Sequence, residues 1–506
     1  MVAFAKRLAA KRPEEIALRD SERSFTWSEL DDALNRAAQA LLSDELGPDR
    51  RIAVFAENAA ETVIAHMGAL IGSASSVPVN FHLTADEVAY ILEDSGTRLL
   101  FVGPETAEVG LEAARRTGVE QVVGWRCEEA GILPWQDWLA RASAEDPPLE
   151  NPPRPNLIYT SGTTGRPKGT NLPPTMFAAG KTVAEHLENV AKGPFCKFGA
   201  HGVIGPLYHT GPLAGSRSLV GGTPVVILGR FDAEATLRAI QDYGIETSVM
   251  VPTHFVRLLA LPEEVRARYD VSSLKSISHT GASCPVEVKR AMLDWWGPVL
   301  WEAYGASEVG TTCAIGPKDW LAHPGSVGRT VPPFEALVVD DEGKPLPAGQ
   351  EGRLYFRDST GRGVVYHNDP EKSAAAHLEP GVFTLGEIGY VDADGFVYIT
   401  DRFSDMIVSG GVNIYPAEAE QELINHPGIA DVACIGIPHA EMGEELKALV
   451  VPEDPANPPG EKEVIAWIRE RISTYKCPRS VQRVDDLGRN TMGKINKRKL
   501  RERYAG

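Results

Sequence analysis

One short segment, Tyr159 to Gly169, constrains the fold more than any other part of the chain. It reads Tyr-Thr-Ser-Gly-Thr-Thr-Gly-Arg-Pro-Lys-Gly, with three glycines, four Ser or Thr hydroxyls and one lysine. Glycine lets backbone N–H groups approach an anion closely, hydroxyls add donors, and Lys168 adds a point charge. The apolar residues 156–159 predict a buried strand that carries the segment. A polyphosphate cradle at the end of a sheet strand is therefore predicted.

This segment differs from the common P-loop. A Walker loop needs Gly-Lys followed by Ser or Thr to hold magnesium. Here Pro167 stands where the second glycine should be, and Gly169 follows the lysine. A flexible surface loop is the competing interpretation, because Gly, Ser and Thr cluster in loops generally. The order of the residues and the preceding strand favour phosphate binding.

Size and charge limit the class of protein. A chain of 506 residues is too long for one core, so two or more domains are expected. The composition, 43% hydrophobic and 24% charged, is that of an ordinary globular protein. A net charge of −18 argues against a dedicated nucleic-acid binder. The basic run between Lys494 and Arg503 fits a solvated helix and a phosphate contact equally well.

The cysteines and the N-terminal residues indicate the cellular compartment in which the protein is expected. Six scattered cysteines form no Cys-x-x-Cys pair, which predicts reduced thiols, no zinc site and no disulfide. The N-terminal residues become charged too soon for a signal-peptide core, and no apolar run reaches membrane-spanning length. We therefore expect a cytoplasmic protein without a transmembrane segment.

Strands and helices alternate through most of the chain. Strands are expected at 51–56, 76–79, 98–102, 224–228 and 247–251, and helices at 61–71, 84–94 and 232–243. Thr26 with Glu29, and Thr84 with Glu87, have the spacing of a capping box at a helix start. This alternation predicts parallel sheets with covering helices.

The pattern changes near residue 402. Shorter strands at 431–437 and 446–451 alternate with a helix at 461–472 and a basic terminal helix. We predict an α/β protein with a large N-terminal domain, residues 1–403, of parallel-rich sheets layered with helices. A small α+β C-terminal domain is expected to span residues 404–506.

The segment 159–169 resembles the signature of the adenylate-forming superfamily of acyl-CoA synthetases, firefly-luciferase-like enzymes and adenylation domains. The resemblance can be followed along nearly the whole chain. In this family a carboxylate attacks the α-phosphate of ATP, which requires magnesium and positive donors aimed at the developing charge. The resemblance therefore implies ATP, CoA and Mg²⁺ as substrates and cofactor.

Residues 301–308, Trp-Glu-Ala-Tyr-Gly-Ala-Ser-Glu, resemble the family motif Tyr-Gly-x-Thr/Ser-Glu. The resemblance implies that Tyr304 stacks on adenine, Ser307 contacts the α-phosphate and Glu308 ligates magnesium. A hard cation prefers a carboxylate oxygen. The full set of residues expected to bind ATP is Thr160, Ser161, Gly162, Thr163, Thr164, Gly165, Lys168, Gly281, Ala282, Ser283, Tyr304, Gly305, Ser307, Glu387 and Arg402.

Two further segments resemble family loops beside the substrates. Pro206-Leu207-Tyr208-His209 resembles an aromatic segment that lines the acyl and nucleotide sites, so His209 is expected to gate the CoA channel or pack on the ligand. A purely structural histidine is the alternative. Residues 281–285 resemble the loop that supports adenine and closes the acyl pocket, and a plain turn is the competing interpretation.

The stretch 383–407 departs from the family pattern. Leu385-Gly386-Glu387 stands where the family usually has Thr-Gly-Asp, whose aspartate accepts hydrogen bonds from the ribose hydroxyls. The carboxylate is retained one methylene farther out. Arg402 matches the usual arginine, a ribose or phosphate contact, and Ser404 occupies the hinge position where Asp or Lys is common.

The C-terminal motifs imply a mobile domain. Residues around Gly410 and Gly411 resemble a loop that borders the pantetheine channel, although adjacent glycines also make ordinary turns. Residues 490–495 resemble the motif with the catalytic lysine, so Lys494 is expected to bridge the substrate carboxylate and the α-phosphate. By the resemblance, the small domain rotates about Ser404 between two half-reactions, and Lys494, Glu308 and His209 are the expected catalytic residues.

The predicted function is that of an acyl-CoA synthetase. The acyl pocket is expected to include Thr253, His254, Thr280 and Val309, in stretches that lack an arginine or lysine for a second carboxylate. An apolar monocarboxylate of fatty, aromatic or steroid type is favoured. An acyl-AMP ligase that loads a carrier protein, a degenerate nucleotide-binding homologue and a luciferase-like oxygenase are the alternatives. The sequence leaves a homodimer open.

Overall fold

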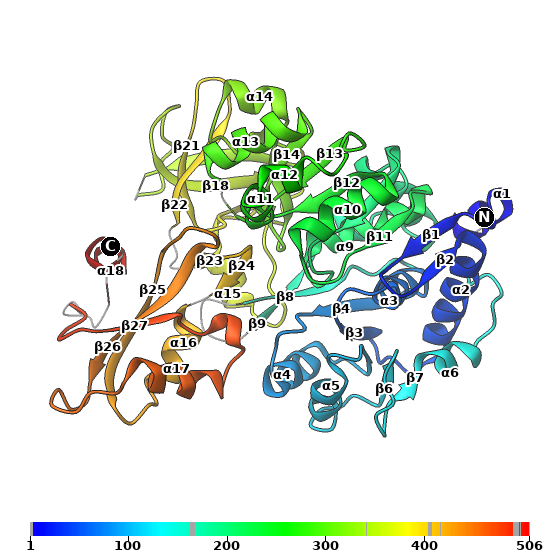
Figure 1. The fold of residues 1–506 in the computed structure, drawn as a ribbon, viewed down its shortest axis with the longest axis horizontal. Helices are drawn as coiled ribbons and strands as arrows, with labels where there is room; N and C mark the ends of the chain where they lie inside the picture. Colours follow the sequence, from blue (N-terminus) through cyan, green and yellow to red (C-terminus); the bar gives the residue numbers. More distant parts are fainter. Residues whose placement is uncertain are drawn as a thin grey trace.

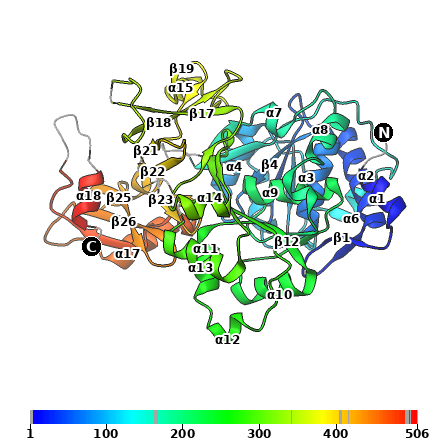
Figure 2. The same cartoon turned by 90° about the horizontal axis from the view of Figure 1, so that it is seen from above.

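The computed structural model describes residues 4–161, 167–282, 284–340, 342–402, 407–414, 416–488, 495 and 497–504. Figures 1 and 2 show a large body of sheets and helices and a smaller one formed by the C-terminal residues, drawn in orange and red. Helix α1 (Phe4–Lys11) lies at the far end of the large body, and α18 (Lys497–Tyr504) lies at the opposite end of the molecule.

The first third of the chain forms a parallel sheet, as its alternation predicts. The strand order is β4-β3-β5-β6-β7, from β3 (Arg51–Phe55), β4 (Ser75–Val79), β5 (Leu99–Val102), β6 (Gln121–Gly124) and β7 (Leu133–Pro134). The helices that follow these strands are α3 (Ala60–Ile71), α4 (Ala85–Ser95), α5 (Ala107–Ala114) and α6 (Trp135–Ala140). Every residue of β4 and β5 is buried, as in parallel strands covered on both faces.

Both predicted capping boxes are present. The Glu29 amide donates to Thr26 Oγ1 at 3.2 Å, and the Thr26 amide donates to Glu29 Oε2 at 2.8 Å, at the start of α2 (Trp27–Ser43). The Thr84 amide donates to Glu87 Oε2 at 2.8 Å at the start of α4. These bonds satisfy backbone N–H groups that a helix start leaves unpaired.

A second, larger sheet holds the middle of the chain. Among the described residues its order is β16-β15-β14-β13-β12-β10-β11-β1-β2, parallel from β1 to β14 and antiparallel at both edges. Its strands are β1 (Ile16–Arg19), β2 (Ser24–Thr26), β10 (Ala200–Val203), β11 (Val225–Ile227), β12 (Ile245–Met250), β13 (Ser276–His279), β14 (Leu300–Ala306), β15 (Gly310–Ile315) and β16 (Arg329–Thr330). The helical segments between these strands are α7 (Pro174–Phe177), α8 (Val183–Val190), η1 (Pro194–Lys197), α9 (Thr210–Ser216), η2 (Arg217–Gly221), α10 (Ala233–Tyr243), α11 (Pro252–Leu259), α12 (Glu263–Arg266), α13 (Val286–Trp296) and α14 (Pro317–Ala322).

The strand that we predict before the segment 159–169 is present, but it belongs to a two-stranded antiparallel sheet. It is β8 (Leu157–Ser161), which pairs antiparallel with β9 (Pro167–Asn171). The segment thus joins the two strands of a hairpin instead of leaving a parallel sheet. Its residues 162–166 lie outside the described ranges.

An antiparallel sheet completes the large body. Its strands are β17 (Phe334–Val339), β18 (Gly352–Asp358), β19 (His377–Glu379), β20 (Val382–Phe383), β21 (Glu387–Val391) and β22 (Val397–Arg402), with α15 (Pro370–Ala375) preceding β19. Strand β21 carries Glu387 toward the end of β14. This sheet therefore supplies one wall of the site.

The C-terminal residues form a further sheet with its own hydrophobic core. Its elements are β23 (Ile407–Ser409), β24 (Val412–Ile414), α16 (Pro416–Leu423), β25 (Ile429–His439), β26 (Gly443–Pro452), α17 (Glu461–Arg469), η3 (Thr474–Lys476) and β27 (Ser480–Arg483). The core packs residues such as Ile407, Leu423 and Ile468. The boundary that we predict at residue 404 falls among 403–406, which are not described. Across the described residues, none of the helices is both long and apolar enough to cross a membrane.

Candidate active site

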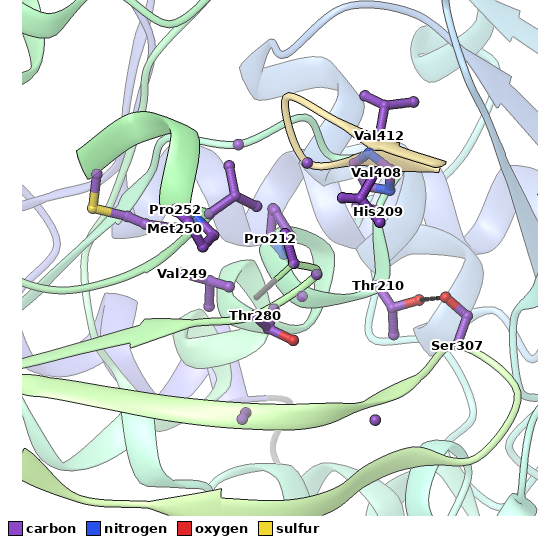
Figure 3. A pocket seen from close by; sticks show the side chains of 18 of the residues that line it. His209, Thr210, Pro212, Val249, Met250, Pro252, Thr280, Ser307, Val408 and Val412 are labelled. Atoms are coloured by element: carbon purple, nitrogen blue, oxygen red, sulfur yellow. Dashed lines mark hydrogen bonds between the residues drawn. The ribbon is translucent and has the colours of Figure 1, made fainter. Parts of the chain in front are cut away.

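A cavity of about 2310 Å³ lies where the ends of β12, β13 and β14 face the β23–β24 hairpin of the small domain. In Figure 3, Val249, Met250 and Pro252 lie on one side of the view, His209, Val408 and Val412 lie on the other, and Pro212 lies between the two groups. Pockets for one small ligand usually measure roughly 300–1,000 Å³. The cavity therefore has room for more than one substrate.

Glu308 lies in the wall of this cavity, just after β14. Its Oε1 accepts a hydrogen bond from Thr160 Oγ1 at 3.2 Å, which joins the β8 strand to the 301–308 motif. Burial raises the pKa of Glu308, while the Thr160 hydrogen bond and the charge of Lys372 act in the opposite direction. Because burial disfavours the bare carboxylate, an added cation would be bound favourably here.

This donor set fits a magnesium ion that arrives with a nucleotide. Mg²⁺ is typically held by one or two carboxylates together with substrate phosphates and waters. Within the described ranges no group of three His, Cys, Asp or Glu side chains could hold a metal by itself. Glu308 with Thr160 therefore suits coordination that is shared with a bound nucleotide.

Tyr304, on β14, and Glu387, on β21, meet in the wall of the same cavity. The Tyr304 hydroxyl donates to Glu387 Oε2 at 2.7 Å, and Glu387 is only 6% exposed. The carboxylate that departs from the family pattern by one methylene is thus anchored from β14. A side chain at Gly305 would place its Cβ 2.0 Å from the Gly310 carbonyl oxygen, so glycine is required after the tyrosine.

His209 and Thr210 form the start of α9 and face the same cavity. Thr210 Oγ1 lies 3.2 Å from Ser307 Oγ, the contact drawn in Figure 3. Burial lowers the pKa of His209 to about 4, with His82 adding to the effect. The ring packs beside Tyr208, with centroids 4.3 Å apart. At neutral pH the imidazole is uncharged, which suits packing or hydrogen bonding.

The other predicted loop residues also line the cavity. Thr253 and His254 lie in the first turn of α11, after β12, and Thr280, Gly281 and Ala282 follow β13. His254 stacks on Phe231, with ring centroids 4.2 Å apart and planes 10° from parallel. Burial lowers the pKa of His254 to about 3. The predicted motifs thus converge on one cavity.

One predicted residue lies away from the cavity, and another has a partner within the protein. Val309 has no exposed surface and packs in the hydrophobic core with Phe334 and Leu354, so the prediction that it lines the acyl pocket is wrong. Its neighbour Gly310 faces the cavity instead. Lys168 Nζ pairs with Asp369 Oδ2 at 2.7 Å, and its role in binding phosphate stays a prediction.

Several predicted residues cannot be located. Gly162, Thr163, Thr164, Gly165, Ser283, Ser404 and Lys494 lie outside the described residues, as do the side chains of Ser161 and Arg402. Their roles stay predictions.

Lys372 is a cavity residue that the sequence does not reveal. Its ammonium lies 4.2 Å from the centroid of the Tyr366 ring. Burial lowers its pKa and the charge of Lys168 adds to this, whereas Glu308 acts in the opposite direction. The residue stands in no motif, so nothing in the local sequence distinguishes it from a solvated surface lysine.

A second unexpected feature is a buried ion pair behind the cavity. Lys289 Nζ lies 2.5 Å from Glu302 Oε2, and His279 Nε2 lies 3.6 Å from the same oxygen. The Lys289 side chain has no exposure, and Glu302 stands two residues before Tyr304 on β14. The pair therefore ties α13 to the strand that carries the site. A lysine on the core face of an amphipathic helix is the one sequence signal of it.

Comparison with known proteins identifies the family. Residues 5–364 match the AMP-binding enzyme family, and residues 418–494 match the AMP-binding enzyme C-terminal domain. The chain is 32% identical to a feruloyl-CoA synthase of Amycolatopsis sp, over 99% of this chain and 98% of that protein. It is 33% identical to a Mycobacterium tuberculosis CoA ligase for a (methyl-dioxo-octahydroindenyl)propanoyl acid, over 99% of this chain and 98% of that protein. It is 32% identical to the fatty acid–acyl-carrier-protein ligase ScoC of Streptomyces coeruleorubidus, over 98% and 95%.

The chain therefore belongs to the AMP-binding enzyme family. This confirms the predicted family and the predicted class of enzyme, an AMP-forming acid–thiol ligase.

Solved structures agree with this membership. The TM-score is 0.84 to the amide bond synthetase McbA of Marinactinospora thermotolerans, at 25% identity over 99% of this chain and 100% of that one. It is 0.80 to the o-succinylbenzoate CoA synthetase MenE of Bacillus subtilis with the product analogue OSB-NCoA, at 25% identity over 99% and 98%. ATP-bound MatB of Rhodopseudomonas palustris gives 0.65, at 26% identity over 99% of both chains. The predicted α/β fold class is confirmed.

Proposed function

We propose that this protein is an AMP-forming acyl-CoA synthetase for an apolar aromatic or fused-ring monocarboxylic acid. The observation that carries the proposal is the composition of the large cavity. Its polar wall holds Glu308 with Thr160 and Tyr304 with Glu387, and its other wall holds Pro212, Val249 and Met250. A nucleotide and an apolar acid can lie side by side in such a space.

In the first half-reaction the substrate carboxylate attacks the α-phosphorus of ATP. A P–O bond forms to the acid, and the bond to the departing pyrophosphate breaks. Mg²⁺ bound at Glu308 would neutralise charge on the phosphates. Glu387, held by Tyr304, would accept hydrogen bonds from the ribose, and the Thr210–Ser307 pair would face the α-phosphate. Lys494 is retained as the predicted donor to the bond that forms.

In the second half-reaction the CoA thiol attacks the carbonyl carbon of the acyl adenylate. A C–S bond forms, AMP leaves with its oxygen, and the thiol proton passes to solvent or to a nearby base. The neutral His209 ring and the Gly410–Gly411 turn border the cavity where the thiol would enter. Rotation of the small domain about Ser404 remains the proposed link between the two steps.

The charges that line the cavity support a monocarboxylate. Two arginines beside the apolar wall are already paired: Arg230 with Glu57 at 2.7 Å and Arg257 with Glu441 at 2.5 Å. A second carboxylate that approached either arginine would have to displace the arginine's present partner. The relatives named above act on ring acids and on fatty acids, which agrees with an apolar substrate.

The test is pyrophosphate release with a panel of acids. Ferulate, indoleacetate, a fused-ring propanoate, octanoate and malonate would be compared with ATP, Mg²⁺ and CoA. We expect release with one or more ring acids and none above background with malonate. Release with malonate alone would refute the proposed substrate class, and no release with any acid would support a degenerate nucleotide-binding homologue.

Loading of a carrier protein is the second candidate, because the relative ScoC is named as a ligase of that kind. It differs only in the thiol acceptor. Mass spectrometry of the thioester formed with CoA or with a purified acyl-carrier protein separates the two. A cytoplasmic location and the choice between monomer and homodimer stay predictions for fractionation and sedimentation.

A further inference from the structure

A buried lysine crosses the boundary between the two domains. Lys476, in η3 of the small domain, lies 2.5 Å from Glu87 Oε1 and 2.7 Å from Glu418 Oε1, and its side chain is 3% exposed. Glu418 belongs to α16 of the same domain, whereas Glu87 belongs to α4 of the large domain. Ser473 Oγ donates to Glu87 Oε2 at 2.6 Å. We call Lys476, Glu418, Ser473 and Glu87 the η3 latch.

Hydrogen bonds within the large domain hold the Glu87 carboxylate in place for its contact with Lys476. Its Oε2 accepts the Thr84 amide at 2.8 Å and the Thr84 hydroxyl at 2.9 Å, so the capping box fixes its direction. Nearby charge and hydrogen bonds from Lys476, together with the bonds from Ser473 and Thr84, lower its pKa against the opposing effect of burial. Because Glu418 moves with Lys476, Glu87 is the partner that depends on how the domains are arranged.

The latch adjoins the cavity through a row of rings. Asn80 Nδ2 donates to the Tyr475 hydroxyl at 3.0 Å, and the Tyr475 and His82 ring centroids are 6.0 Å apart. His82 packs on Phe81 at 4.3 Å, and Phe81 meets Tyr208 edge-on at 5.2 Å, beside His209. A continuous row of packed side chains therefore connects η3 with His209 in the cavity wall.

The β23–β24 hairpin of the small domain also lies close to the large domain at this cavity. Gly411 has φ +80°, and a Cβ added there would lie 3.0 Å from a Val251 methyl group. Arg257 Nε pairs with Glu441 Oε1 at 2.5 Å on the rim. Both contacts require the small domain to sit close against β12 and α11, which is the arrangement that the η3 latch holds.

The comparisons relate this arrangement to a reaction step. At nearly equal identity and coverage, the whole chain superposes better on the CoA synthetase that holds a product analogue than on the ATP-bound one. We propose that Lys476 is a positioning residue for thioester formation, which acts by docking on Glu87 and holding the small domain over the cavity. This inference rests on the proposed function.

The test uses Glu87→Gln, which keeps the size of the side chain and its capping-box hydrogen bond but removes the charge. Each half-reaction is measured alone: acid-dependent ATP–pyrophosphate exchange without CoA, and thioester formation from synthetic acyl-AMP with CoA. We expect thioester formation to slow by about tenfold or more, since the ion pair of Lys476 with Glu87 is replaced by a weaker hydrogen bond to a neutral amide. Exchange should stay within about twofold of the wild type.

Asp86→Asn is the matched control, because Asp86 neighbours Glu87 in α4 but pairs with Arg116 of the large domain. It should leave both half-reactions unchanged. Ser473→Ala removes only the hydroxyl contact to Glu87, and we expect a smaller loss with the same selectivity for the second step. It replaces Glu87→Gln if that variant fails to fold.

Equal loss in both half-reactions, a loss confined to exchange, or no loss in either would overturn the inference. A wild-type protein without exchange for any acid would instead refute the proposed function. The two failures are therefore distinguishable.

Discussion

Replacement of Tyr304 by phenylalanine tests the most specific contact of the proposed nucleotide site. The hydroxyl of Tyr304 donates to the buried Glu387 carboxylate at 2.7 Å. A hydrogen bond to a charged group contributes about 1.5–3 kcal/mol, which corresponds to roughly 10- to 150-fold in an equilibrium or rate constant. Phenylalanine keeps the ring, so any stacking surface for a base is preserved while the carboxylate loses its anchor.

The assay is steady-state pyrophosphate release with ATP and the acid varied in turn. We expect kcat/KM for ATP to fall by roughly 10- to 150-fold, while KM for the acid stays near the wild-type value. Tyr269→Phe is the control, since Tyr269 donates to Glu234 at 2.6 Å away from the cavity. Unchanged ATP kinetics in Tyr304→Phe, or an equal loss in both variants, would refute the assigned role of the pair.

Three further predictions concern the metal, the buried ion pair and pH. Glu308→Gln should lower magnesium-dependent exchange by about 100- to 1,000-fold, and recovery at high Mg²⁺ would distinguish a metal role from misfolding. Lys289→Met should destabilise the protein by about 3–5 kcal/mol in denaturant unfolding because Glu302 is left without its cation, and adding Glu302→Gln should restore part of the loss. Burial lowers the pKa of His66 and His201 to about 3, so below pH 6.5 the unfolded state binds more protons. As the pH decreases below 6.5, the free energy of unfolding should then fall by up to about 1.4 kcal/mol per pH unit for each ring. If the slope of unfolding free energy against pH were the same in His201→Gln as in the wild type, this prediction would be contradicted.

Local signals in the sequence predict local structure well in this chain. The strand expected at 98–102 is β5, and the helix expected at 84–94 is α4, each within one residue at either end. Thr84 and Glu87 specify that helix start because both partners lie within one turn. The motif around Tyr304 and Glu308 also reaches the cavity, since its glycine turn and strand are encoded together.

Contacts between distant segments could not be read in the same way. The ion pair of Lys168 with Asp369 joins residues about two hundred positions apart in the chain, so no local pattern predicts it. Lys476 looks like a surface lysine until the fold brings Glu87 to it. Val309 follows the motif closely and was expected to line the pocket, but the β14–β15 turn directs it into the core. Such pairings depend on tertiary packing, which leaves no periodic trace in a single chain.

The central claim is that an acid and ATP react in this cavity to give an adenylate that a thiol then consumes. The most direct measurement is mass spectrometry of a single turnover, first without CoA and then after its addition. We expect a mass of acyl-AMP together with pyrophosphate, followed by acyl-CoA and free AMP. Formation of ADP and phosphate, or an adenylate that persists when both CoA and carrier protein are present, would contradict it.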